Sequence, residues 1–170
     1  SFVSAGANGA CAIDASGNAW CWGENSRGTV GDGSTTDRTA PVQLAGANVL
    51  QVAVGGTIAC SVRSDATLRC WGSDGSGQLG QGTTSFDAPV AVDASQWTSV
   101  SSGAEHTCGI KTGSTLWCWG SNSSGQLGAT TANGWTSTPV QVSGSNWIAV
   151  SAGARHTCGI QSSGSLWCWG

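Results

Sequence analysis

The residues that could carry chemistry in this 170-residue sequence are eight cysteines, two histidines and nine acidic side chains. The cysteines form four pairs, each ten residues apart, and corresponding pairs recur every 48 to 50 residues. Zinc ligands usually come two to four residues apart and combine two such pairs. A ten-residue spacing across a hairpin, with tryptophan beside the sulfur, instead brings the two sulfurs within bonding distance. We therefore predict no metal site and four disulfides, Cys11–Cys21, Cys60–Cys70, Cys108–Cys118 and Cys158–Cys168.

The predicted disulfides bear on both stability and location. Closing a loop of about eleven residues stabilises a hairpin by roughly 3 kcal/mol when the effect is treated as chain entropy. Such bridges persist in oxidising compartments and are rare in the cytosol. We therefore expect an exported protein, secreted and extracellular or held at the cell surface, with the periplasm as the other oxidising location.

The histidines and acidic residues give no sign of an active site. His106 and His156 occupy the same place in two repeat units, where the other units have Gly9 and Ile58. A catalytic histidine does not recur by repeat position, so we interpret both as hydrogen-bonding groups at strand ends. The acidic residues lie mostly in turns, where such side chains bond the backbone, and no nucleophile elbow or phosphate-binding loop is found. The sequence therefore predicts no catalytic residue, no cofactor and no enzyme activity.

The cysteine pairs mark repeat units, which we place at residues 1–46, 47–94, 95–143 and 144–170, the first and last incomplete. Each unit supplies about four short strands separated by Gly, Ser, Asn and Asp turns. Four strands in about 40 to 50 residues are typical of propeller blades, so we predict an all-β propeller segment. In the last two units the expected strands are 139–142, 148–152, 156–160 and 166–170.

The cysteines also predict the register of each hairpin. If Cys108 faces Cys118, side-chain alternation puts Ile110 and Leu116 on the disulfide face and two tryptophans on the other face. Both faces are then apolar, which fits a blade packed between two neighbours. We expect Gly109, opposite Trp117, to leave room for that indole to lie across the strand.

Several motifs of these units recur in a fixed order: Val-Ser-Ala-Gly at 150–153, His-Thr-Cys-Gly-Ile at 156–160, Leu-Trp-Cys-Trp-Gly at 166–170, Gly-Gln-Leu-Gly at 125–128 and Pro-Val at 139–140. Together these motifs resemble the RCC1-type repeat. The resemblance covers the whole chain and implies a seven-bladed propeller. The version with paired cysteines resembles repeats of secreted or surface proteins of bacteria.

Composition limits the classes of partner that the chain is expected to bind. The net charge is −3, with six basic residues in all, so no basic patch is available for nucleic acid. No apolar run approaches the roughly 20 residues of a membrane span. The nuclear member of the resembled family binds a small GTPase and chromatin, which the acidic balance and the oxidising location disfavour. The chain has four cysteine hairpins but only three complete loops with a following Pro-Val strand. We therefore expect it to be a segment of a longer array rather than half of a ring closed by a homodimer.

The positions that vary between units are the candidates for reading a partner. Variation is largest in segments 32–40, 81–88 and 129–138. Phe86 and Trp135 are expected on these loops as exposed anchors, unless each folds back over its own blade. Asp37 and Arg38 are the candidate charged contacts. We predict a non-catalytic scaffold that binds a protein or self-assembles; the alternatives are an inhibitor-type propeller that caps an enzyme and a carbohydrate-binding propeller.

Overall fold

The computed structural model describes residues 1–82 and 85–170, and over these residues it contains fifteen strands and no helix. The strands form four antiparallel sheets in sequence order, here called blades 1 to 4. Blade 1 comprises β1 (Phe2–Ala5), β2 (Gly9–Ile13), β3 (Ala19–Gly23) and β4 (Arg38–Gln43). Blade 2 comprises β5 (Val49–Val54), β6 (Ile58–Arg63), β7 (Leu68–Gly72) and β8 (Phe86–Ala91). Blade 3 comprises β9 (Trp97–Ser102), β10 (His106–Lys111), β11 (Thr115–Ser121) and β12 (Trp135–Gln141), and blade 4 comprises β13 (Trp147–Ala152), β14 (Thr157–Gln161) and β15 (Leu166–Trp169).

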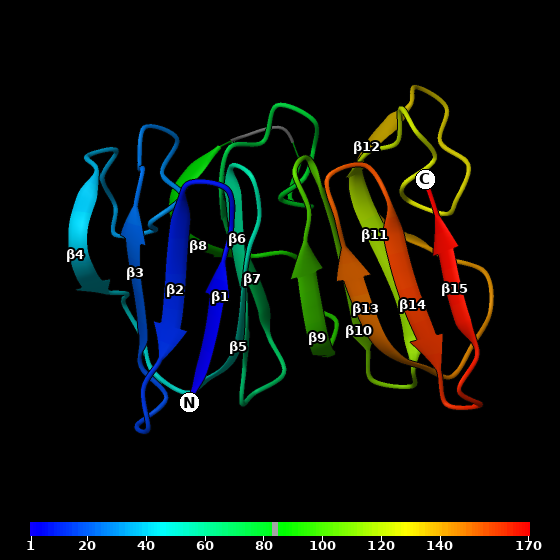
Figure 1. Cartoon of the computed structure of the whole chain (residues 1–170), viewed down its shortest axis with the longest axis horizontal. Coiled ribbons are helices and arrows are strands. Elements are labelled where there is room, and N and C mark those ends of the chain that lie inside the picture. Colours follow the sequence, from blue (N-terminus) through cyan, green and yellow to red (C-terminus); the bar gives the residue numbers. More distant parts are fainter. Residues whose placement is uncertain (83–84) are drawn as a thin grey trace.

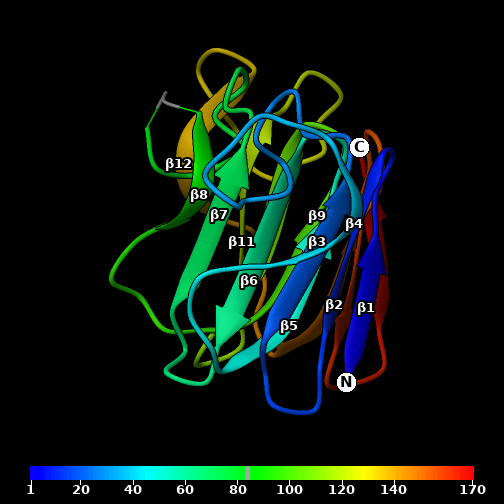
Figure 2. The same cartoon turned by 90° about the vertical axis from the view of Figure 1, so that its left-hand side faces the viewer.

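The blades stand side by side along an arc (Figure 1). The first strands β1, β5, β9 and β13 contact one another in succession and form the inner side of the arc. Figure 2 views the row from the blade 1 end and shows β8 and β12 on the side opposite β1. This arrangement confirms the predicted all-β propeller segment. In the described part of the chain, no helix is long and apolar enough to cross a membrane.

The predicted hairpin register is confirmed in every blade. All eight cysteines are bonded in the four predicted pairs. In blade 3, Cys108 pairs with Cys118, Gly109 with Trp117, and Ile110 with Leu116. Because side chains alternate along a strand, each blade has a disulfide face and a tryptophan face.

The expectation that Trp117 lies over Gly109 is wrong. The ring over Gly109 belongs to Trp97 at the start of β9, and a Cβ added to Gly109 would lie 2.8 Å from its ring carbons. Trp147 covers Gly159 in the same way. The first-strand tryptophan crosses the second strand to pack edge-on against the buried indole of the third strand, with 5.5 Å between the ring centroids of Trp97 and Trp119. Lys111 Nζ instead lies over the ring of Trp117, 4.1 Å from its centroid.

In blades 1 to 3 the disulfide face packs against the tryptophan face of the next blade. Between blades 2 and 3, the Cys60–Cys70 bridge and Leu68 form one cluster with Trp97 and Trp119. At the junction between blades 1 and 2 the indole also makes a polar contact, since Trp71 Nε1 in blade 2 donates to the carbonyl of Thr29 in blade 1 at 2.9 Å. In blades 2 and 3, the apolar side chains of both hairpin faces are therefore buried against neighbouring blades.

Main-chain contacts join the blades at the inner turns. The N–H of Ala7 donates to the carbonyl of Gly55 at 3.3 Å, and the N–H of Gly56 donates to that of Gly103 at 3.0 Å. Only glycine allows this approach, because a Cβ on Gly55 would lie 2.2 Å from the Gly103 oxygen. The same contact recurs from Ala104 to Gly153.

Candidate functional site

The loops that precede the fourth strands all emerge at one edge of the arc. Their described residues are 24–37, 73–82 with 85, and 122–134, and main-chain hydrogen bonds join the ends of the third strands to the turns between the first and second strands. In blade 1, for example, Glu24 N–H donates to the carbonyl of Asn8 at 2.9 Å. We call these loops and turns, without residues 83–84, the upper rim; they lie at the top of Figure 1.

The four candidate contact residues occupy equivalent places on this rim. Arg38 and Phe86 are the first residues of β4 and β8, where they pair with Gly23 and Gly72. Trp135 is the first residue of β12 and pairs with Ser121, one position earlier in the repeat. The expectation that Phe86 and Trp135 lie on loops is therefore wrong. Each outer strand resumes pairing beyond a register shift near the end of the third strand and so extends to the rim.

The two aromatic side chains differ in exposure. Phe86 is partly buried and packs against the core cluster shared by blades 2 and 3. Trp135 is 39% exposed and borders a shallow groove of about 300 Å³ whose other walls include Thr131, Asn133 and Thr136. The alternative that the ring folds back over its own blade therefore describes Phe86, while Trp135 presents an accessible indole.

The two charged candidates are held by contacts within the blade 1 loop. Asp37 Oδ1 accepts the main-chain N–H of Asn25 at 2.8 Å. Arg38 Nε donates to Oδ2 of Asp32 at 2.6 Å, and the two side chains form an ion pair. Burial raises the pKa of Asp32, but hydrogen bonds from Ser34 and Arg38 outweigh it and lower that pKa overall. Both charged side chains therefore stabilise the loop through these contacts. Only part of each charged group is left to contact a partner.

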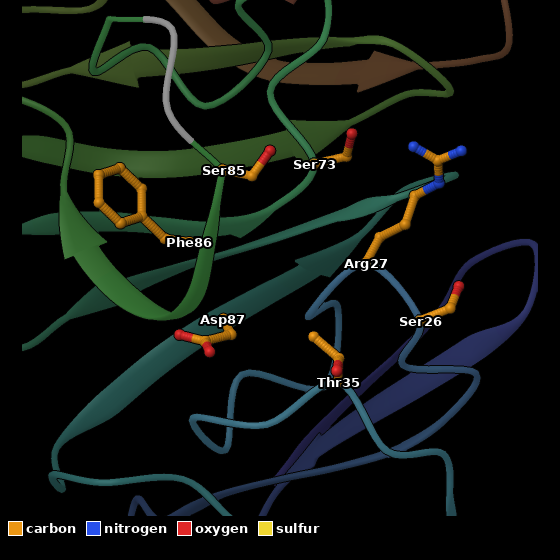
Figure 3. A pocket seen from close by; sticks show the side chains of 7 residues that line it. All are labelled: Ser26, Arg27, Thr35, Ser73, Ser85, Phe86 and Asp87. Carbon is orange, nitrogen blue, oxygen red and sulfur yellow. The ribbon is translucent and has the colours of Figure 1, made fainter.

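A second groove lies on the rim between blades 1 and 2 and has a volume of about 420 Å³ (Figure 3). The blade 1 loop contributes Arg27 and two hydroxyl side chains, and the edge of blade 2 contributes Phe86 and Asp87. The groove therefore offers hydroxyls, one guanidinium, one carboxylate and one ring edge. Across the described residues, His, Cys, Asp and Glu form no group of three that could hold a metal ion.

The structure shows His106 as a strand-end hydrogen-bonding group. It is fully buried, and its Nε2 lies 2.8 Å from Oγ1 of Thr157 in blade 4. The Thr157 hydroxyl donates to the carbonyl of Gln126 at 2.8 Å, so the imidazole donates to the hydroxyl oxygen. Burial, with a smaller contribution from His156, lowers the pKa of His106 to about 4. The imidazole is neutral near pH 7 and links blade 3 to blade 4.

Comparison with known proteins agrees with this geometry. The profile "Regulator of chromosome condensation (RCC1) repeat" matches residues 16–62, 67–110 and 114–160. A second profile of the same repeat matches residues 1–29, 49–78 and 97–126. No curated protein sequence matches the chain.

Solved structures share the fold at low sequence identity. Human WBSCR16 matches the whole chain over 47% of its own length, with a TM-score of 0.91 and 21% identity. Yeast RCC1 (Prp20), solved bound to Kap60, matches 99% of the chain over 43% of its own length, with a TM-score of 0.82 and 18% identity. The ectodomain of the Arabidopsis thaliana receptor kinase ACR4 matches 99% of the chain over 48% of its own length, with a TM-score of 0.59 and 22% identity. The chain therefore spans about half the length of these structural relatives.

Proposed function

The chain belongs to the family of RCC1 repeat proteins, and on that premise we propose that it is a non-catalytic module that binds a protein partner through its upper rim outside the cell. Its paired hairpins and interblade clusters provide a rigid frame. Its rim loops differ from blade to blade and provide the surface that a partner would read.

One observation carries the proposal. At equivalent rim positions the three complete blades present different side chains: Arg38, Phe86 and Thr136 at one position, and Asp37, Ser85 and Trp135 at the position before it. The scaffold positions around them repeat, so the variation is concentrated where a partner would touch several blades at once. An accessible indole beside a polar groove is the kind of anchor that dominates protein interfaces.

The location outside the cell rests on the four disulfides, which are stable in oxidising compartments. The secreted, cell-surface and periplasmic settings all meet this condition. The structural relatives supply a parallel: Kap60 binds yeast RCC1, and the Arabidopsis fold belongs to a receptor ectodomain. These relatives support a binding role for the fold, and they do not identify the partner of this chain.

The proposed absence of catalysis follows from the chemistry of the rim grooves. The groove between blades 1 and 2 has Arg27 and Asp87 as its ionisable groups, and the one between blades 3 and 4 has Glu105 and Arg155. Both grooves also contain serine hydroxyls, but among the described residues no hydroxyl hydrogen-bonds to the carboxylate of Asp87 or Glu105, which is the contact that would activate it as a nucleophile. Opposite charges and hydroxyls around an open groove instead suit hydrogen bonding to a protein surface.

The test is capture of extracellular proteins on immobilised chain, followed by variants of the rim. We expect one protein to be retained stoichiometrically and Trp135→Ala to weaken its binding at least tenfold. Leu50→Ala is the matched control, because Leu50 is 64% exposed but lies on the inner strand β5. Equal binding by wild type and Trp135→Ala would refute the rim proposal. Inhibition of a captured enzyme would assign the inhibitor alternative, and binding to a glycan array that Trp135→Ala abolishes would assign the carbohydrate alternative.

A further inference from the structure

The rim loop of blade 3 contains an Asn-Gly step, Asn133–Gly134, directly before Trp135. Asparagine followed by glycine is chemically labile, because glycine has no Cβ to obstruct attack of its main-chain nitrogen on the asparagine side chain. The sequence contains one other such step, Asn8–Gly9. Both asparagines are exposed, so access of water alone does not distinguish the two steps.

The structure holds the Asn8–Gly9 step in place. Asn8 Nδ2 donates to Oε2 of Glu24 at 2.6 Å, and the Asn8 carbonyl accepts the N–H of Glu24 at 2.9 Å. Gly9 is the first residue of β2 and pairs with Gly23 of β3. For the Asn8 side chain to reach the Gly9 nitrogen, it would have to leave Glu24 and the end of the strand would have to rotate.

The Asn133–Gly134 step lacks these restraints. Both residues are exposed in the turn before β12, and neither the Asn133 side chain nor the Gly134 N–H has a hydrogen-bond partner among the described residues. Asn122 holds the loop on either side of this step. Its Nδ2 donates to the carbonyl of Ala129 at 2.9 Å, and its N–H donates to the carbonyl of Gly134 at 2.7 Å. The loop is therefore anchored, while the two groups that must react can move toward each other.

From this contrast we propose that Asn133 is a site of spontaneous deamidation. The main-chain nitrogen of Gly134 loses its proton to solvent and attacks Cγ of Asn133. The new C–N bond closes a succinimide ring, the bond from Cγ to the side-chain nitrogen breaks, and that nitrogen takes up a proton and leaves as ammonia. Water then opens the ring at either carbonyl, which gives aspartate or isoaspartate. Water is the only co-reactant, and no electron is transferred.

The product changes the groove beside Trp135. Apart from Asn133, the groove is lined by threonines, Ala132, Val140 and the indole itself, none of which is ionisable. Deamidation therefore places a negative charge where there is none. Isoaspartate also lengthens the main chain next to the Gly134 carbonyl that accepts the Asn122 N–H.

The consequence is a loss of partner binding at Trp135, because an unpaired carboxylate loses its hydration when a partner covers it. This consequence rests on the function proposed above. The deamidation itself does not rest on that function.

The test is incubation of the disulfide-bonded chain at pH 7 and pH 9, followed by peptide mapping with mass spectrometry. We expect residue 133 to gain about 1 Da at least ten times faster than residue 8, as a mixture of aspartate and isoaspartate. The rate should be higher at pH 9, because the Gly134 nitrogen must lose its proton before it attacks.

Glu24→Ala is the matched variant. It frees the Asn8 side chain from its hydrogen bond and should accelerate deamidation at residue 8 while leaving residue 133 unchanged. Equal rates at residues 8 and 133 in the wild-type chain would overturn the proposal. Aspartate as the only product would also overturn it, because direct hydrolysis without a ring gives no isoaspartate.

Partner binding tests the consequence separately. Asn133→Asp should weaken binding of the partner captured on the rim at least tenfold. Unchanged binding would overturn the effect on the partner and leave the deamidation standing. Absence of a mass gain at residue 133 would overturn the modification site whatever the partner does.

Discussion

Replacement of Asp74 by asparagine should stabilise the protein. Asp74 is the second residue of the rim loop of blade 2 and is 4% exposed, and its Oδ1 accepts the N–H of Leu79 at 2.8 Å. The equivalent Asn25 and Asn122 accept the same bond in blades 1 and 3. Their amide nitrogens also donate, as from Asn122 Nδ2 to the carbonyl of Ala129 at 2.9 Å. The second oxygen of Asp74 has no partner among the described residues, and burial raises the pKa of this carboxyl group.

The size of the expected stabilisation follows from Oδ2 of Asp74, the buried oxygen without a partner among the described residues. A buried polar group without a partner costs about 1–3 kcal/mol, and a new neutral hydrogen bond contributes about 1 kcal/mol. Asp74→Asn should therefore raise the free energy of unfolding at pH 7 by about 1–2 kcal/mol. For a chain of this size, each kcal/mol corresponds to roughly 2–4 °C in Tm.

The gain should depend on pH. A folded pKa above the unfolded value means that the folded state retains the proton, so Asp74 destabilises the fold increasingly as the pH rises above about 4. The advantage of Asp74→Asn should therefore shrink as the pH falls toward 4 and be largest near neutrality.

Urea unfolding of the disulfide-bonded chain at pH 4 and pH 7 measures both effects. The reverse substitution Asn122→Asp is the matched control, because it introduces a carboxylate at the same place in blade 3 and should lose about 1–2 kcal/mol at pH 7. If Asp74→Asn were no more stable than wild type at pH 7, or if its gain were the same at both pH values, the reasoning about the buried oxygen would be refuted.

Three further predictions concern single features. Ala66 has φ 62°, where the equivalent hairpin positions hold Gly17 in blade 1, Ser114 in blade 3 and Gly164 in blade 4. Because a side chain is strained at this φ, Ala66→Gly should add about 1 kcal/mol in urea unfolding; a loss would contradict this explanation. Because the folded state depresses the pKa of His106 to about 4, stability should fall as the pH drops from 6.5 toward 4. The loss should approach about 3 kcal/mol relative to His106→Asn, and parallel pH profiles would be the contrary result. Alkylation of the denatured chain should add no mass without reductant and eight adducts with it, as intact mass spectrometry would show; free thiols would remove the argument for export.

The sequence was sufficient for the hairpin register because a two-residue side-chain period extends one cysteine pairing to every neighbouring pair. It could not tell which tryptophan covers Gly109, since Trp97 and Trp117 reach the same face from different strands. The rim was harder still. A register shift lets Phe86 and Trp135 pair at the strand ends. The residue types at these positions do not predict that shift. The hydrogen bond from the main-chain N–H of Asn25 to Asp37 forms only when the loop is folded, so the sequence alone does not predict it either.

The glycine-to-carbonyl contacts at the inner turns have an evolutionary consequence. They set the pitch between successive blades with backbone atoms that each unit carries, so the pitch tolerates divergence of the side chains. Blade 2 illustrates this tolerance, because Ser61 and Arg69 replace the Gly and Trp pair of blade 3 and the contact from Gly56 to Gly103 persists. A gene segment that encodes one unit could thus be duplicated, exchanged or deleted without a compensating change in its neighbours. Lineages built from such units can change their binding loops and their blade number as independent characters.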